Sequence, residues 1–391
     1  MLRIAAIDNF LDCIKLIIPI KSKSYNNNSN QEVIMPTNLY DAHKQWATRP
    51  ADERFESLES LQVFTENRKK SSTESDRTLK DVNLRVLENG SIAINRNSPP
   101  ANLSHWAFSQ LCYSVGAPAK YLRTLPPEIV QNCLSHGLQN SNYRCKLLLR
   151  GNSEDSDTNH QQTASAFTGP NYGRIWDFDV VEQIIEATKD RGWRTPPAES
   201  MNGSETSGLY ASDRDMFIFM VNDENPVEIG NAKLGRGFFC WNSETGAASF
   251  GLTTFLYNYV CGNHIVWGAE EVREIRIVHK GEAVDRFQNL ALPRLNQFVE
   301  NRGYNETVKE TVSRAMTEPI AKDLDETLEW FKDKPFTKSE VTNAWEAGID
   351  EGNDVTTVWG MVQGLTAHAR SMPYTNWRVN LERRAGSLLN L

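Results

Sequence analysis

The sequence predicts an α+β protein with a central, largely antiparallel sheet, flanking helices and a mostly helical C-terminal layer. Residues 216–221 form a continuous apolar run, which is typical of a strand buried on both faces. Residues 238–241 and 275–278 are further strand candidates. From Phe287 onward, apolar residues recur at helical spacing, and Thr337 with Glu340 forms a capping box.

The N-terminal half mixes both kinds of element. We expect helices at residues 38–47, from Ser57, and as a pair from Ser104, with a strand at residues 145–149. Asn89-Gly90 between two alternating apolar stretches predicts a β-hairpin, because both residues tolerate positive φ angles. Asp179 predicts a helix N-cap and Gly192 the corresponding C-cap. The polar stretches 69–77 and 151–162 are interpreted as loops.

Composition limits the class of protein. Six cysteines are scattered without a C-x-x-C pair, which indicates reduced thiols and argues against a cysteine zinc site. No apolar stretch reaches membrane-spanning length, so we expect a soluble, cytoplasmic protein without membrane contact. We expect an N-terminal extension and linker at residues 1–34, an α+β core at 35–286 and a helical region at 287–391.

The formal net charge of −8 argues against a simple electrostatic polyanion binder. The charge is unevenly distributed, however. Between residues 101 and 150 five basic residues oppose the single acid Glu128, namely Lys120, Arg123, Arg144, Lys146 and Arg150. A locally basic face on an acidic protein is therefore compatible with the sequence.

The stretch 235–244 (GRGFFCWNSE) is the first candidate site. Glycines permit close backbone approach, while Arg236 and Trp241 suit phosphate contact and base stacking. The alternative is a hairpin that enters a core strand. A separate candidate is the loop that contains Tyr172 and Arg174, just before a predicted helix. The alternative interpretation of this loop is a capping turn.

Two further groups could carry chemistry. His264 and His279, with Arg276 and Lys280 nearby, could be a metal pair or an acid–base pair, but nothing in their spacing requires it and structural histidines are the favoured interpretation. Asp213 and Asp215 lie two residues apart and could bind Mg²⁺ on one face of a strand, or pair with Arg214 between them. No G-x-S-x-G or H-E-x-x-H motif occurs, so we predict no catalytic residue and no cofactor, with Mg²⁺ as the alternative.

Several segments together resemble a known family. They are residues 103–138, NYGRIWDFDVV from Asn171, SDRDMFIFMV from Ser212, GRGFFCWNSETG from Gly235, YNYVCGNHIVWG from Tyr257 and RIVHKG from Arg276. Their combination is similar to the phage- and plasmid-borne family called domain of unknown function 932, over about residues 35–286, with a helical tail at Val358. The resemblance implies a setting of mobile elements, where recombination and single-strand handling are common functions.

Our leading hypothesis is a non-enzymatic protein that binds or anneals single-stranded DNA in recombination or replication, with homo-oligomerisation left open. Such proteins need phosphate-tracking cations and stacking aromatics. The predicted nucleic-acid-binding residues are Lys120, Arg123, Arg174, Lys233, Arg236, Trp241, Arg276 and Lys280. One alternative is a metal-dependent enzyme acting on nucleic acid or nucleotide through Asp213, Asp215 and His264. Another is a protein that binds and counters a host defence or restriction factor.

Overall fold

The structure is a computed structural model. It describes residues 53–95, 99–151, 162–195, 197–199, 205–230, 232–258, 263–265, 275–300, 304–372 and 375–390. The chain divides into two compact units, Met1–Thr37 and Asn38–Leu391, and every described residue belongs to the second. The helix expected at 38–47 and nearly all of the loop expected at 151–162 lie outside the described residues, as does the extension at 1–34.

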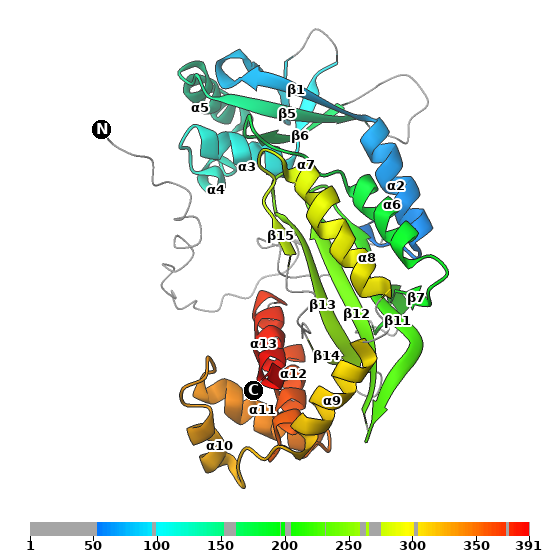
Figure 1. The fold of residues 1–391 in the computed structure, drawn as a ribbon. Coiled ribbons are helices and arrows are strands. Elements are labelled where there is room, and N and C mark those ends of the chain that lie inside the picture. Colours follow the sequence, from blue (N-terminus) through cyan, green and yellow to red (C-terminus); the bar gives the residue numbers. More distant parts are fainter. Residues whose placement is uncertain are drawn as a thin grey trace, which may run out of the picture. The chain divides into compact units, whose positions relative to one another are not determined.

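The α+β prediction is confirmed, with the strands distributed over separate sheets (Figure 1). The first sheet has six strands in the order β1-β5-β6-β4-β3-β2. All of its pairs are antiparallel except β4 with β6. Its strands are β1 (Ser72–Thr78), β2 (Leu84–Val86), β3 (Ile92–Ile94), β4 (Ala101–Leu103), β5 (Arg144–Gly151) and β6 (Gln162–Thr168). The predicted Asn-Gly hairpin joins β2 to β3, with Gly90 at a φ of 79°.

The loop predicted at 69–77 is wrong, because β1 occupies most of it. This strand pairs with β5 along its whole length, from Ser72 opposite Arg150 to Thr78 opposite Arg144. It is an edge strand whose side chains are all exposed or half-buried, so it carries no apolar alternation. Polar, charged residues are typical of edge strands because they discourage pairing with another chain.

Helices cover one face of this sheet. They are α3 (His105–Ser114), α4 (Ala119–Leu122) and α5 (Pro127–Gln139), and the expected Ser104 caps α3 by accepting from the Ala107 amide at 3.0 Å. Their apolar side chains pack against alternate residues of β5, Cys145, Leu147 and Leu149. The opposite face of β5 therefore carries Arg144, Lys146, Leu148 and Arg150.

The second sheet is built on a long hairpin of β11 (Met216–Ile229) and β12 (Ala232–Asn242), which contain the apolar runs that the sequence shows. It continues through β13 (Phe250–Asn258), which pairs with both β14 (Asn263–Ile265) and β15 (Ile275–Ile277). Strands β10 (Leu209–Ala211) and β7 (Trp193–Arg194) pair with β11. A separate small hairpin pairs β8 (Pro197–Glu199) with β9 (Glu205–Ser207).

One face of the second sheet lies against helices α2 (Leu58–Lys70), α6 (Asp177–Thr188) and α8 (Leu292–Glu300) (Figure 1). The predicted N-cap of α6 at Asp179 is wrong, because the helix begins at Asp177 with Trp176 as its N-cap. Asp179 instead lies in the first turn, where it pairs with Lys69 of α2. Gly192 does have a left-handed φ of 68°, but it follows the end of α6 by several residues.

The C-terminal helices confirm the predicted helical layer. They are α9 (Tyr304–Thr317), α10 (Leu324–Trp330), α11 (Lys338–Asp350), α12 (Val358–Arg370) and α13 (Thr375–Ser387). Helix α7 (Ala283–Arg286) continues into α8 through a π-helical turn at Phe287–Ala291. Pro293 lies in the first turn of α8 and cannot donate a backbone hydrogen bond, which accounts for the widened turn before it. Among the described residues no helix is both long and apolar enough to cross a membrane.

Helices α11 and α12 approach unusually closely through glycine. A Cβ atom on Gly364 would lie 2.2 Å from the Ala344 carbonyl oxygen, which belongs to the rigid backbone of α11. We predict that Gly364→Ala separates these helices and lowers the free energy of unfolding by about 1–3 kcal/mol in chemical denaturation. Asn343→Ala, on the exposed face of α11, is the control and should leave stability unchanged or slightly higher. Equal stability of the Gly364 variant and wild type would contradict this description of the contact.

Candidate functional site

A buried ion cluster lies where β5, α2, α6 and the end of β12 meet. The carboxylate of Glu244, which is 1% exposed, pairs with Arg150 of β5 and with Arg68 of α2. Its other oxygen accepts the backbone N–H of Asp177 at 2.8 Å, at the start of α6. Arg68 also pairs with Asp177, which accepts from Asn242 Nδ2 at 2.6 Å. Two arginines thus lie against two carboxyl groups in a largely buried site.

Burial and the neighbouring charges together determine the pKa values of this cluster. Burial would raise the pKa of Glu244, but the charges of Arg68 and Arg150 outweigh it and hold that pKa below its usual value. Burial, followed by the neighbouring Glu244 charge, raises the pKa of Asp177 to about 7. Burial lowers the pKa of Arg150 to about 10, so that this guanidinium remains charged at neutral pH. Charges that are desolvated in this way are tolerated because each has opposite charges and hydrogen bonds around it.

The turn between β12 and β13 of the second sheet forms hydrogen bonds with helix α3, which packs on the first sheet. Thr245 offers its carbonyl oxygen to Trp106 Nε1 at 3.0 Å and to Gln110 Nε2 at 2.9 Å, both on α3. The other end of the Gln110 amide accepts the backbone N–H of Phe167 on β6 at 2.8 Å. On the side of the second sheet, Ser243 Oγ donates to the Arg214 carbonyl oxygen at 2.6 Å.

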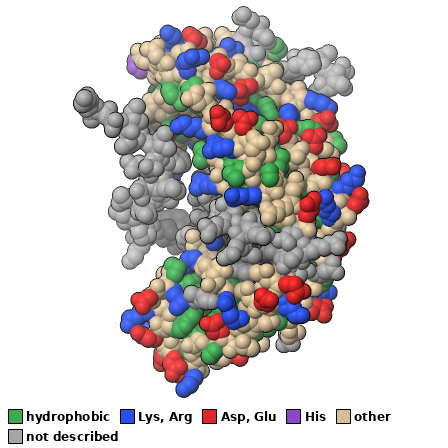
Figure 2. Space-filling view, viewed as in Figure 1, with side chains coloured by type: hydrophobic (Ala, Val, Ile, Leu, Met, Phe, Trp, Pro, Cys, Tyr) green, Lys and Arg blue, Asp and Glu red, His purple; other side chains and the backbone are tan. Residues whose placement is uncertain are grey.

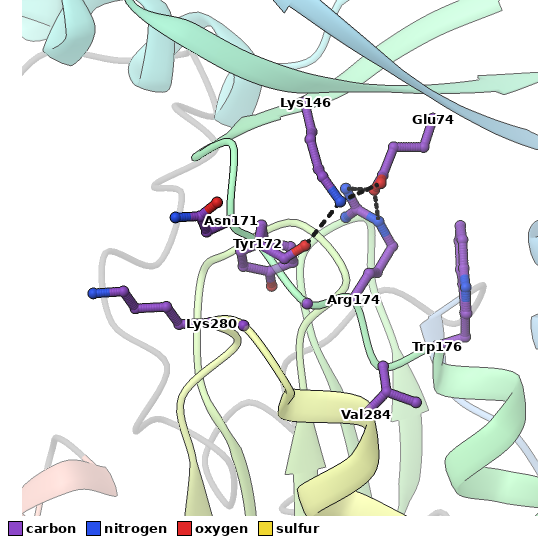
Figure 3. Close-up of a pocket in the computed structure, with 10 residues that line it drawn as sticks. Glu74, Lys146, Asn171, Tyr172, Arg174, Trp176, Lys280 and Val284 are labelled. Atoms are coloured by element: carbon purple, nitrogen blue, oxygen red, sulfur yellow. Dashed lines mark hydrogen bonds and ion pairs between the residues drawn. The ribbon is translucent and has the colours of Figure 1, made fainter.

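A pocket of about 500 Å³ opens next to this cluster, on the face of β5 that the helices leave uncovered (Figure 3). Lys146 of β5 and Glu74 of β1 form one wall. The loop from Asn171 to Trp176 and the segment from Lys280 to Val284 form the others. Figure 3 shows Lys146 and Arg174 converging on Glu74, whereas Lys280 and Asn171 point away from them at the rim.

The charged side chains among the described lining residues are three cations and one carboxylate. Arg174 Nε donates to Glu74 at 2.7 Å, and Lys146 Nζ lies 3.1 Å from the same carboxylate. Burial would raise the pKa of Glu74, but Arg174 and Lys146 outweigh it and keep that pKa low. Since one carboxylate cannot balance Lys146, Arg174 and Lys280, the pocket carries a net positive charge.

Aromatic rings surround the central cation. The Arg174 guanidinium lies 5.1 Å from the ring centre of Tyr172 and 5.6 Å from that of Trp176. Its side chain is 3% exposed, and its Nη1 has no hydrogen-bond partner among the described residues. The pocket therefore combines positive charge with flat π surfaces, which is the composition of sites for anions that carry a ring.

His279 is a structural residue that packs against Tyr172 and Gly173, two of the residues that line the pocket. Its ring stacks on Tyr172 with centroids 5.1 Å apart, and its Nδ1 lies 3.1 Å from the Gly173 carbonyl oxygen. Since a carbonyl only accepts, Nδ1 carries the proton. Burial lowers the pKa of His279 to about 4, so the ring is neutral at physiological pH.

The structure gives Arg236 and Trp241, of the glycine-rich stretch, internal contacts. Arg236 donates to the carbonyl oxygens of Phe298 and Val299 at 3.2 and 3.1 Å, in the last turn of α8. A cation at this position also complements the helix dipole. Trp241 stacks on Phe239 with centroids 5.4 Å apart and covers Gly251, where a Cβ atom would lie 1.9 Å from the indole ring.

The remaining candidates are dispersed over several elements. Lys233 on β12 and Arg276 on β15 are exposed, and Arg276 Nε donates to Ser249 Oγ at 3.0 Å. Lys120 and Arg123 are exposed on α4 and at its C-terminal end. His264 lies on β14 opposite Tyr257, and its side chain is outside the described residues. Of the eight predicted nucleic-acid contacts, Arg174 and Lys280 are brought together in the pocket.

The predicted strand geometry of Asp213 and Asp215 is wrong, because both lie in the turn between β10 and β11. Asp215 is buried and accepts Ser212 Oγ at 2.6 Å, whereas Asp213 is exposed. Within the described ranges, no group of three or more His, Cys, Asp or Glu side chains could hold a metal ion.

In the sequence, Lys146 and Arg150 are singled out only as members of a basic stretch and Glu244 only as the end of a candidate segment, and Glu74 is not singled out. The signal was present in β5, where Arg144, Lys146 and Arg150 occupy alternate positions between apolar residues. On a strand this spacing places the cations on one face. The partners Glu74 and Glu244 carry no comparable signal, because β1 and the turn after β12 are far away in the sequence.

Residues 182–376 match the family model described as domain of unknown function (DUF932), so the chain carries a domain of this family. The expected resemblance is thereby confirmed. The matched range begins inside α6, later than expected, and includes α12 with most of the helical tail. No curated protein and no solved structure matches this chain.

Replacing Glu244 should lower the stability of the folded protein. Glu244→Gln leaves Asp177 as the only carboxylate of the cluster facing Arg68 and Arg150, so we expect the free energy of unfolding to fall by about 3–5 kcal/mol in urea denaturation. Glu329→Gln is the matched control, since its ion pair with Lys332 is exposed on the surface. That variant should change stability by less than about 1 kcal/mol. Similar losses in both variants would contradict the role assigned to Glu244.

His279 should make stability depend on pH. Its folded pKa of about 4 lies below the unfolded value of 6.5, so the unfolded chain binds more protons between these values. Its contribution is complete above pH 6.5 and is lost as the pH falls toward 4. His279→Gln removes it, so the stability difference from wild type should shrink by up to about 1.4 kcal/mol per pH unit in that window. Parallel stability curves would contradict the neutral buried ring; Asp177 is common to both proteins and cancels.

Proposed function

We propose that this protein binds single-stranded DNA without being an enzyme, as an annealing or strand-protecting protein of a phage or plasmid. The observation that carries the proposal is the pocket beside Lys146, on the face of β5 that α3, α4 and α5 do not cover. It presents Lys146, Arg174 and Lys280 against the single carboxylate of Glu74, next to the rings of Tyr172 and Trp176.

The pocket has the dimensions and chemistry of a nucleotide subsite. Its volume of about 500 Å³ falls in the usual range of small-ligand sites. Cations that track phosphates together with aromatic faces for bases are the elements of sequence-independent single-strand binding. Duplex bases are stacked on each other, so stacking on Trp176 favours an unpaired strand.

The acidic total charge is compatible with this proposal, because solvent ions screen exposed charges beyond about 8–10 Å. What a bound phosphate experiences is therefore the local excess of cations. Several Lys and Arg side chains lie on the face in view, over the region where α3, α7 and β15 are drawn (Figure 2). The phage or plasmid setting rests on the family resemblance rather than on this geometry.

The metal-dependent alternative has no comparable support. Asp215 is hydrogen-bonded to Ser212 within its own turn, so its carboxylate is already engaged. The host-factor alternative likewise has no specific surface in its favour among the described residues.

The proposal predicts that fluorescence anisotropy with labelled oligothymidine shows binding that weakens as salt rises. Lys280→Ala removes a rim cation, so affinity should fall about fivefold and the salt slope by about 0.7. Lys338→Ala, an exposed lysine on α11, is the control and should behave like wild type. Absence of wild-type binding even at low salt would refute the proposed function, and equal binding by the Lys280 variant would refute the pocket as its site.

A further inference from the structure

A second group of cations lies around helix α3. Arg123, at the end of α4, donates to the His105 carbonyl oxygen at 3.1 Å and to Ser109 Oγ at 2.7 Å, and its guanidinium lies 4.9 Å from the Phe108 ring centre. Arg214, in the turn between β10 and β11, lies 5.7 Å from the ring centre of Trp106. Both arginines act on the same imidazole, since after burial their charges are the next causes that lower the pKa of His105.

We call this set, with Lys120 on α4, the α4 group. It contains three cations, Lys120, Arg123 and Arg214, and Asp213 is the carboxylate whose charge acts on His105 beside them. The pocket has the same balance, with three cations and Glu74. In each group the cations named here outnumber the carboxylate named here.

The turn between β12 and β13 touches both the pocket and helix α3. Gly246 at its tip is exposed, and a Cβ atom there would lie 3.6 Å from the Tyr172 ring and 3.6 Å from Gln110 Nε2 of α3. Tyr172 lines the pocket, and Gln110 lies on the helix that carries His105 and Ser109, the contacts of Arg123. Residues 242–249, all of them described, contain one acidic side chain, Glu244, and it is buried. No exposed negative charge on this turn would therefore repel an anion that crosses it.

We infer that a single strand of DNA crosses the turn at Gly246, with one phosphate at the pocket and a later one at the α4 group. This inference rests on the proposed function. It extends that function from one binding subsite to a path that joins two groups of cations. A free phosphate or a mononucleotide occupies only the pocket, because it cannot reach both groups. The two groups then act together only on a ligand with several linked phosphates, which is the behaviour of a multivalent site.

The test compares two labelled oligothymidines, a dinucleotide and one of about twelve nucleotides, in anisotropy titrations at low salt. The variants are Lys280→Ala for the pocket, Arg123→Ala for the α4 group, and the double variant, with Lys338→Ala as control. Lys120→Glu is a second α4 variant, because Lys120 is exposed and its replacement leaves the Arg123 contacts intact.

On the dinucleotide, Lys280→Ala should weaken binding about fivefold, and both α4 variants should match wild type. On the longer oligonucleotide every variant should weaken binding, and the double variant should lower the salt slope by about 1.4, twice the single loss. Binding of the long strand that is insensitive to both α4 variants would overturn the inference and leave the proposed function intact. Equal sensitivity of both lengths to the α4 variants would also overturn it. If wild type binds neither length, the proposed function itself has failed.

Discussion

The ion cluster at Glu244 is the constraint on which the rest of the structure depends. A single buried carboxylate pairs with Arg68 of α2 and Arg150 of β5, and it accepts the first backbone N–H of α6. Three elements distant in sequence are thus held at the end of β12. Because an unpaired charge in this environment is very costly, these elements can be displaced only together. Arg174, whose charge also acts on Glu244, is positioned beside this cluster and forms part of the adjacent pocket.

Much of the fold was predictable because apolar periodicity reports burial directly. The apolar runs of β11 and β12, the alternating strands on either side of the Asn-Gly turn, the helix capped by Ser104 and the C-terminal helices all show it. The secondary-structure predictions were wrong where an element is held by hydrogen bonds or ion pairs instead of by apolar packing. Strand β1 is held by pairing with β5 alone, so its sequence resembles a loop. The start of α6 is fixed by Glu244 from another element, which no local capping pattern could reveal.

The candidate site shows the same limit. Arg174 and Lys280 could be proposed from their local surroundings, yet their proximity depends on how the loop before α6 meets the segment after β15. Arg236 illustrates the opposite case. It lies between two glycines in a conspicuous stretch, but the carbonyl groups at the end of α8 account for its guanidinium contacts. An arginine near aromatics is therefore informative only when its other partners are known, and those partners lie more than sixty residues away in the chain.

The amide of Gln110 takes the place of a peptide group between the two sheets. Its oxygen accepts from β6, and its nitrogen donates to the turn after β12, so a chain of hydrogen bonds passes from one sheet to the other through a single side chain. Glutamate has no donor for the Thr245 carbonyl, and asparagine is one methylene shorter. The length of the Gln110 side chain therefore matches the distance between β6 and the turn after β12. A side chain of another length at position 110 would lose one of these two hydrogen bonds or change the distance between β6 and the turn.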